Sequence, residues 1–176
     1  MKTILVHNAT STYQHDCVST GPVLEHIVIA LVGDNRLTGA YTLNHFRFSN
    51  FGLSYLAMNM NGKQIPRLAY EPYFRTNDYI REYLALFEGL AMDIGNQAIN
   101  LRPEQWGSDY PHFIFRLAPW GHPSLPKSGN LRIELKYRTA LPATINLICF
   151  AEYASLLEIE RAHSVVKFSM KTLYHR

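Results

Sequence analysis

The sequence lacks any apolar run that approaches the roughly 18 residues that a membrane-spanning helix needs. It also lacks a secretory signal peptide, because Met1-Lys2-Thr3-Ile4 leads directly into a short apolar alternation and then into polar residues. Both absences predict a chain without a membrane-spanning segment that is not exported by the secretory route.

Cysteine is scarce, and charge of one sign does not accumulate. The two cysteines, Cys17 and Cys149, have no C-x-x-C spacing, and we interpret them as reduced thiols in a polar loop and in a core strand. The formal net charge is only +3, and the basic residues are scattered. This weak charge gives no argument for a specific nucleic-acid partner.

Motifs that carry catalysis or bind cofactors are missing. The sequence has no G-x-S-x-G elbow, no H-E-x-x-H and no Gly-rich phosphate loop. Histidine occurs eight times, but never with the H-x-H spacing of closely placed metal ligands. We therefore predict a protein that is not an enzyme, with no catalytic residue, metal site, cofactor or small-molecule substrate.

Two groups of residues could in principle bind a metal ion or catalyse a reaction. His15, Asp16 and Cys17 could ligate zinc, although a solvated loop explains them better because no second ligand pair stands nearby. Four carboxylates on alternating strand positions could meet across strands, as a glycosidase pair does. They are Glu134, Glu152, Glu158 and Glu160. We interpret these four as charges that face solvent.

Apolar and aromatic residues are what the chain has in quantity. Hydrophobic residues make up 47% and aromatic residues 12% of its 176 residues. A chain of this size can bury a full core as one domain, residues 1–176, and aromatic side chains pack well on a pleated sheet. The composition therefore favours a single, mainly β domain.

Apolar periodicity predicts strands in the first half of the chain. Lys2–Val6 alternates, Asn8–Gly21 is a polar stretch, and Val23–Val32 is almost continuously apolar, as in a strand buried on both faces. Leu53–Met60 runs into Asn61-Gly62, a strong hairpin signal because both residues tolerate positive φ. Pro66 then ends pairing of the return strand because it lacks a backbone donor.

Strand patterns return after residue 111, with His112–Leu117 as the first. Leu131–Arg138 alternates without a fault, with the apolar residues expected inside and four charges outside. We expect this strand to form an antiparallel hairpin with the strand Thr144–Tyr153. Leu156–Glu160 and Val165–Phe168 complete the pattern as short edge strands.

One segment, near residues 77–94, has helical periodicity. Thr76 or Asn77 can cap its start, and Gly95-Asn96 can end it. The apolar stripe is formed by residues three and four apart. They are Ile80, Tyr83, Leu84, Phe87, Leu90, Ala91 and Ile94. Such a stripe must pack on its own domain or on a partner.

These patterns together predict a mainly β fold: an antiparallel jelly-roll sandwich of about eight strands with one inserted amphipathic helix. The strand number and chain length match a jelly roll, but periodicity alone does not separate it from an immunoglobulin-like sandwich.

Four sequence blocks, taken in order, resemble a known family. They are HIVIALVGDNRLTGAY, FGLSYLAMNMNGKQIP, NDYIREYLALFEG and SGNLRIELKYRTALPATINLICFAEYASLLEIER. They resemble the C-terminal jelly roll of the double-jelly-roll major capsid protein of Polinton/Maverick-type elements and adintovirus-like DNA viruses. The resemblance covers about residues 23–168, most of the chain.

The resemblance implies a structural capsid subunit, or a fragment or domesticated remnant of one. Its implied partners are other copies of the capsid protein, in a homotrimer that forms a pseudo-hexameric capsomer, and an N-terminal jelly roll that this chain does not contain. It implies no cofactor and no catalytic residue. The implied location is the virion capsid for a viral chain and the cell interior otherwise.

Two other functions stay open at this point. A lectin-like or cytokine-like binding module would gather aromatic and polar residues at a rim, where Tyr70, Tyr73, Phe74 and Trp106 are the first candidates. A cupin-like enzyme would need three or four metal ligands that converge inside the barrel.

Overall fold

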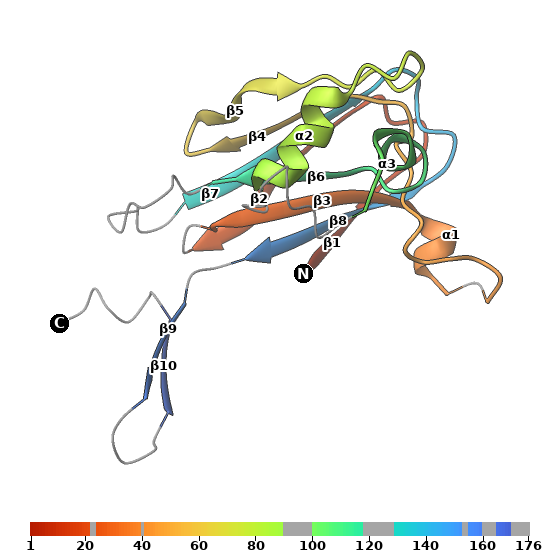
Figure 1. Ribbon diagram of the computed structural model, residues 1–176. Coiled ribbons are helices and arrows are strands. Elements are labelled where there is room, and N and C mark those ends of the chain that lie inside the picture. The colour runs from red at the N-terminus through yellow and green to blue at the C-terminus, as the bar shows by residue number, and fades with distance from the viewer. Residues whose placement is uncertain are drawn as a thin grey trace.

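The computed structural model describes residues 1–21, 24–39, 41–89, 100–117, 129–152, 155–159 and 165–169. Eight strands form two four-stranded antiparallel sheets that pack face to face (Figure 1). Sheet 1 has the order β1 (Lys2–Val6), β8 (Ile145–Glu152), β3 (His26–Gly33) and β6 (His112–Arg116). Sheet 2 has the order β2 (Thr12–Gly21), β7 (Gly129–Tyr137), β4 (Leu53–Met60) and β5 (Lys63–Tyr70).

The order of these strands identifies the fold. Chain neighbours change sheet at every step except β4 to β5, and strands from opposite ends of the chain pair in both sheets. Eight antiparallel strands connected in this way form a jelly roll. The predicted fold class is therefore confirmed, and the immunoglobulin-like alternative is excluded.

The core lies between the sheets. Sheet 1 contributes Ile29 and Leu147, and sheet 2 contributes Leu56 and Ile133, all completely buried. The predicted alternation of residues 131–138 is confirmed, because Leu131, Ile133, Leu135 and Tyr137 are buried while the residues between them are not. Each buried aliphatic side chain stabilises the fold by about 1.5–3 kcal/mol relative to an exposed one.

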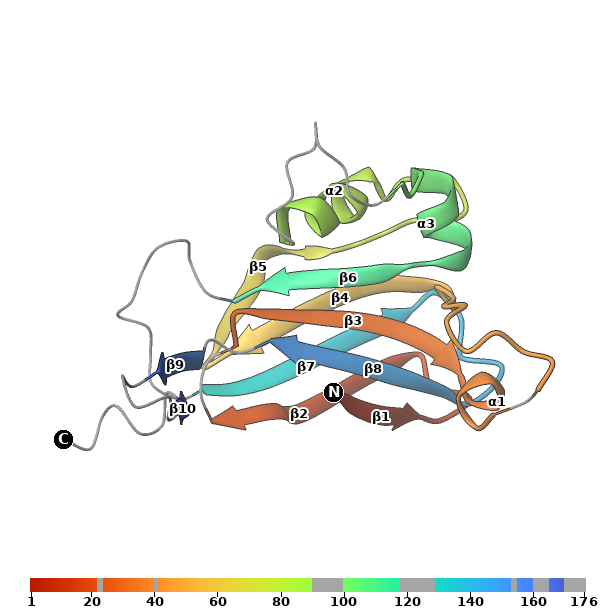
Figure 2. The ribbon, with the colours of Figure 1, turned by 60° about the horizontal axis from the view of Figure 1, so that its bottom comes forward.

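Two helices cover one edge of the sandwich, where β5 and β6 lie (Figure 2). They are α2 (Ile80–Gly89) and α3 (Pro103–Asp109), and a third helix of one turn, α1 (Asp34–Leu37), follows β3. The sequence patterns did not predict α3, although Pro103 stands at its first position and the Arg102 backbone N–H donates to the Gln105 side-chain oxygen at 3.2 Å.

The predicted helix is confirmed in part. It begins at Ile80, and residues 90–94 lie outside the described part of the chain. Its buried side also differs: Ile80 and Leu84 are exposed, whereas Leu86 and the charged Glu82 are buried. The helix contains apolar residues on several sides, so periodicity could not identify the side that faces β6.

The polar stretch Asn8–Gly21 was expected as a loop, but it contains β2, ten residues long. This strand lies at the edge of sheet 2 and pairs with β7, with an irregularity between His15 and Ser19. Exposure alternates along this strand, but the half-buried positions hold Tyr13 and His15, so the sequence shows little apolar alternation. Pairing with a neighbouring strand, which periodicity does not report, makes this stretch a strand.

The predicted hairpin between residues 131–138 and 144–153 is wrong. The first of these strands, β7, lies in sheet 2, and the second, β8, lies in sheet 1. A connection of about six residues fits either a hairpin or a crossing between two stacked sheets that lie roughly 10 Å apart. In the sequence, two strands that each bury one face show the same apolar alternation whether they pair in a hairpin or lie in different sheets.

The other turn and strand predictions are confirmed wholly or in part. Asn61 and Gly62 have φ values of 50° and 81°, so the β4–β5 hairpin is confirmed. Beyond Ile65, pairing with β4 is interrupted, but it resumes at Tyr70, so Pro66 only interrupts the strand. The last two predicted strands exist as β9 (Ser155–Ile159) and β10 (Val165–Ser169), but they pair with each other and not at the edge of either four-stranded sheet.

Candidate interaction surfaces

An aromatic cluster lies under α2 and α3, at the β5–β6 edge. Trp106 is completely buried, with its ring centroid 5.4 Å from that of Phe113 and 5.5 Å from that of Tyr79. Its indole N–H donates a hydrogen bond to the backbone oxygen of His112, at 3.1 Å. Phe74 packs on the same indole ring. These rings extend the core between the sheets to the two helices and fix both helices to the sandwich.

The aromatic residues predicted as a binding rim are therefore distributed differently. Tyr70, Phe74 and Trp106 belong to this buried cluster or line its border. Tyr73 lies apart, with the guanidinium carbon of Arg138 3.8 Å from its ring centroid, a cation–π contact near the surface. The structure does not bring the four together as a rim.

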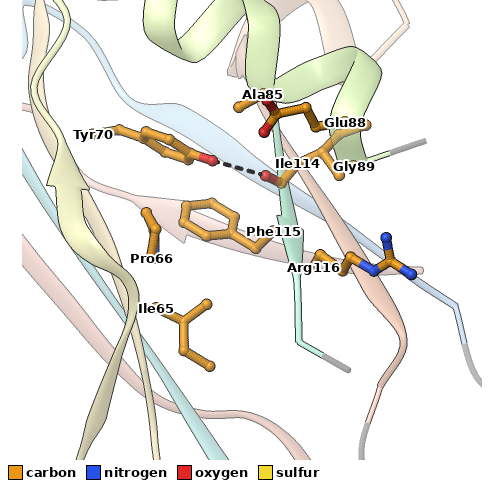
Figure 3. Close-up of a pocket in the computed structure, with 9 residues that line it drawn as sticks. All are labelled: Ile65, Pro66, Tyr70, Ala85, Glu88, Gly89, Ile114, Phe115 and Arg116. Atoms are coloured by element: carbon orange, nitrogen blue, oxygen red, sulfur yellow. Dashed lines mark hydrogen bonds between the residues drawn. The ribbon is translucent and has the colours of Figure 1, made fainter. Parts of the chain in front are cut away.

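One cleft opens beside the cluster, between β5, β6 and α2 (Figure 3). Its volume is about 230 Å³, below the roughly 300–1,000 Å³ of most small-molecule sites. The Tyr70 hydroxyl donates to the backbone oxygen of Ile114 at 3.3 Å, and burial raises the pKa of Tyr70 to about 12. Glu88 and Arg116 are the charged residues of the lining. The wall is mainly apolar and offers no pair of groups for acid–base chemistry.

Candidate metal ligands do not converge within the described ranges, where no three His, Cys, Asp or Glu residues form a group that could hold a metal ion. His15 contacts the Tyr13 hydroxyl and the Lys2 ammonium, and its pKa is lowered, first by burial. Asp16 is exposed and lies 3.4 Å from Arg132. The side chain of Cys17 lies outside the described residues.

Of the four carboxylates considered as a catalytic pair, the two whose side chains the structure describes lie in different sheets. Glu134, in sheet 2, lies 3.4 Å from the Lys136 ammonium, and Glu152, in sheet 1, lies 3.9 Å from an imidazole nitrogen of His26. The side chains of Glu158 and Glu160 lie outside the described part of the chain.

Cys149 lies on the inner side of β8, as expected for a core-strand thiol. It is 2% exposed, and burial raises its pKa to about 12. Because a nucleophilic cysteine needs a lowered pKa and an open position, this thiol is placed for packing and not for attack.

The outer surface of sheet 1 is unusually apolar. Phe150 of β8 is 54% exposed and Leu5 of β1 is 45% exposed, while Val28 of β3 and Ile148 of β8 are half-buried. We call these four residues, with the exposed Thr3 beside them, the apolar face. Figure 2 shows β1, β8 and β3 toward the viewer, with no helix in front of them.

The outer surface of sheet 2 is built differently. Arg132, Glu134 and Lys136 project from β7, and the Lys136 ammonium lies 4.4 Å from the centroid of the Tyr55 ring. Arg132 donates to the side-chain oxygen of Gln14 on the neighbouring strand. We call these five residues the charged face. Each of its three charged side chains contacts a neighbouring side chain of the same chain.

Comparison with known proteins adds the following. No protein-family model matches the chain, and no curated protein matches it. Among solved structures, the crystal structure of the mavirus major capsid protein is similar, with 13% sequence identity and a TM-score of 0.46. The match covers 99% of this chain and 41% of that chain, so this chain spans about two fifths of the length of that capsid protein.

Sequence reasoning did not identify the apolar face. The signal was present in β3 and β8, whose apolar residues occupy both alternating positions. A strand of this kind was expected to be covered on both sides, and the structure shows that the outer side is open at β8.

Each helix in the part of the chain that the structure describes is too short or too polar to span a membrane.

Proposed function

We propose that this chain is a structural subunit of a virus-type capsid, or a descendant of one, that acts by assembling with copies of itself. The strand order of the two sheets is the observation that carries the proposal, because viral capsid proteins are one of the main groups built from this jelly roll. The ordered sequence blocks that resemble double-jelly-roll capsid proteins support the same assignment.

The surfaces are consistent with a role in assembly. Large apolar side chains stand open on one sheet, and such patches on a folded chain are typical of contacts with other proteins. The described clefts and side-chain groups give no equally specific support for a ligand or a reaction. The location that follows from this function is the virion capsid, with the trimer as the assembly unit and this chain as the second of two jelly rolls.

Particle mass in solution tests the proposal. Light scattering after size-exclusion chromatography, over a hundredfold range of concentration, should show a mass that rises to a trimer or a multiple of it. Negative-stain electron microscopy should then show particles of one size. A chain that stays monomeric over the whole range would contradict the proposal.

A further inference from the structure

We propose that side chains of α2, α3 and β5 close the free edges of β5 and β6 to strand addition, so that this side of the jelly roll does not pair with strands of other chains. The inference goes beyond the proposed function, because it holds for the folded chain whatever that chain does. It adds that copies of the chain join through surfaces other than these two edges.

Two sheet edges lie together on this side of the sandwich (Figure 2). Among the described strands, β6 ends sheet 1 and pairs with β3 alone, and β5 ends sheet 2 and pairs with β4 alone. An edge strand carries backbone N–H and C=O groups that have no strand partner, and such a row can bind a strand of another chain. A soluble sandwich therefore needs to block these groups.

The register of β6 identifies the backbone groups on its free edge. The Leu117 N–H donates to the Glu25 oxygen at 2.9 Å, just beyond the pairing of β6 with β3. Hydrogen-bonded pairs alternate along an antiparallel ladder, so the positions two and four residues before Leu117 also face β3. His112 and Ile114 occupy the other set of positions and therefore turn their backbone groups toward the free edge.

Side chains already occupy both of these carbonyls. The Trp106 indole N–H donates to the His112 oxygen at 3.1 Å. The Tyr70 hydroxyl donates to the Ile114 oxygen at 3.3 Å (Figure 3). Trp106 belongs to α3 and Tyr70 to β5, and both side chains are buried. A strand added at this edge would have to displace both hydrogen bonds and the packed rings that make them.

The carbonyls of β5 are bound in the same way. Residues 66–69 have no partner in the register with β4, yet all four of their carbonyls accept a side-chain hydrogen bond. The Gln64 amide donates to the first two, at 3.4 and 3.1 Å, and the Arg81 guanidinium of α2 donates to the last two. Glu82 of α2 accepts from the Glu71 N–H at 3.2 Å. These bonds leave no continuous row for a new strand.

An apolar side chain on the same strand shows why such protection matters. Leu68 is 70% exposed on β5. Apolar side chains on an edge strand favour pairing with other chains, because the added strand covers them. Arg81 places its charge next to this position by binding the Leu68 carbonyl. An added strand would have to remove that charge from water, which costs free energy.

The experiment opens the β5 edge in the full chain. Arg81→Met and Gln64→Met remove the donors and keep side chains of similar length. The matched control is Arg36→Met, because Arg36 also donates to a backbone carbonyl, that of Asn44 at 3.3 Å, but follows β3 in α1 and not a free edge. Thioflavin T fluorescence and the infrared band of intermolecular β-sheet are followed below the unfolding temperature.

The closed-edge proposal predicts a clear order of rates. Arg81→Met should form intermolecular β-sheet roughly tenfold faster than the unmodified chain. Gln64→Met should show a smaller increase, because its two hydrogen bonds are longer. Arg36→Met should behave as the unmodified chain does. Arg81→Lys, which keeps the charge and a donor, should restore most of the protection.

Thermal unfolding separates an open edge from a loosened fold. The Gln64 side chain is exposed, so Gln64→Met should keep the unfolding midpoint, and its added association then comes from the edge. If Arg81→Met does not fold, Gln64→Met decides the question alone. If the folded variants associate no faster than Arg36→Met, the inference is wrong. Trimers of the proposed kind give neither signal, so this result does not depend on the proposed function.

Discussion

The two sheets of this jelly roll share one core but have opposite outer surfaces. Sheet 2 presents Arg132, Glu134 and Lys136, whose charges are compensated by neighbouring side chains, whereas sheet 1 presents Phe150 and Leu5 to solvent. Both sheets gain the same kind of stabilisation from their inner sides. The difference teaches that the outer side of sheet 1 is shaped by something other than the stability of the isolated domain.

The largest effect should separate the inner and outer sides of β8. Leu147→Ala removes a completely buried side chain and should lower the free energy of unfolding by about 2–5 kcal/mol. Ile148→Ala, one residue along on the outer side, should cost less than about 1.5 kcal/mol, because that side chain is only partly covered. Urea unfolding of both variants at low concentration measures this. Equal losses would mean that the apolar face is already covered by the chain itself.

The second largest effect is expected at β6, the strand of sheet 1 that α2 covers. A Cβ placed on Gly89 of α2 would overlap the Ile114 side chain, which projects from β6. Overpacking of this kind costs about 1–3 kcal/mol, more than the roughly 1 kcal/mol that alanine gains over glycine in a helix. Gly89→Ala should therefore destabilise the protein in thermal unfolding. A stabilised variant would show that α2 does not lie tightly on this strand.

A smaller effect concerns the pH dependence of the same helix cover. Burial raises the pKa of Glu82, whose carboxylate accepts a hydrogen bond from the Glu71 backbone N–H at 3.2 Å. A raised pKa means that the folded state binds the proton more tightly than the unfolded state. The contribution of Glu82 to stability is therefore greatest below its ordinary pKa of 4.5 and is lost as the pH rises through its folded value.

Glu82→Gln keeps a hydrogen-bond acceptor and removes this titration. The variant should gain stability relative to the unmodified chain as the pH rises above 4.5, because the buried carboxyl of the unmodified chain then becomes charged. Denaturant unfolding at a series of pH values measures the difference. A difference that does not change with pH would mean that solvent reaches the carboxylate freely.

The smallest effect should come from the charged face. Lys136→Ala removes the 3.4 Å ion pair with Glu134 and the contact with Tyr55, both on a solvated surface. It should cost less than about 1 kcal/mol, and the cost should shrink as salt is added. Unfolding at low and high ionic strength tests this. A large loss that does not depend on salt would show that this face, and not the apolar one, contributes a buried contact.

Local patterns predicted much of the secondary structure. The alternation of residues 131–138, the turn at Asn61-Gly62 and the mainly β class follow from side-chain periodicity and from the φ values that these two turn residues tolerate. The strand β2 could not be predicted in the same way, because an edge strand facing solvent has too few apolar residues to show a pattern. The helix α3 had a local start signal, but it is short and carries no amphipathic stripe.

The sequence by itself determined that this chain buries alternating apolar side chains in a sandwich, because that information lies in residues two apart. Only the tertiary structure decided that β7 and β8 lie in different sheets, and that Phe150 stands open while Leu147 is buried. Which strands become neighbours depends on contacts between residues far apart in the chain, and no local spacing encodes them. The proposed closure of the β5 and β6 edges is a property of that arrangement.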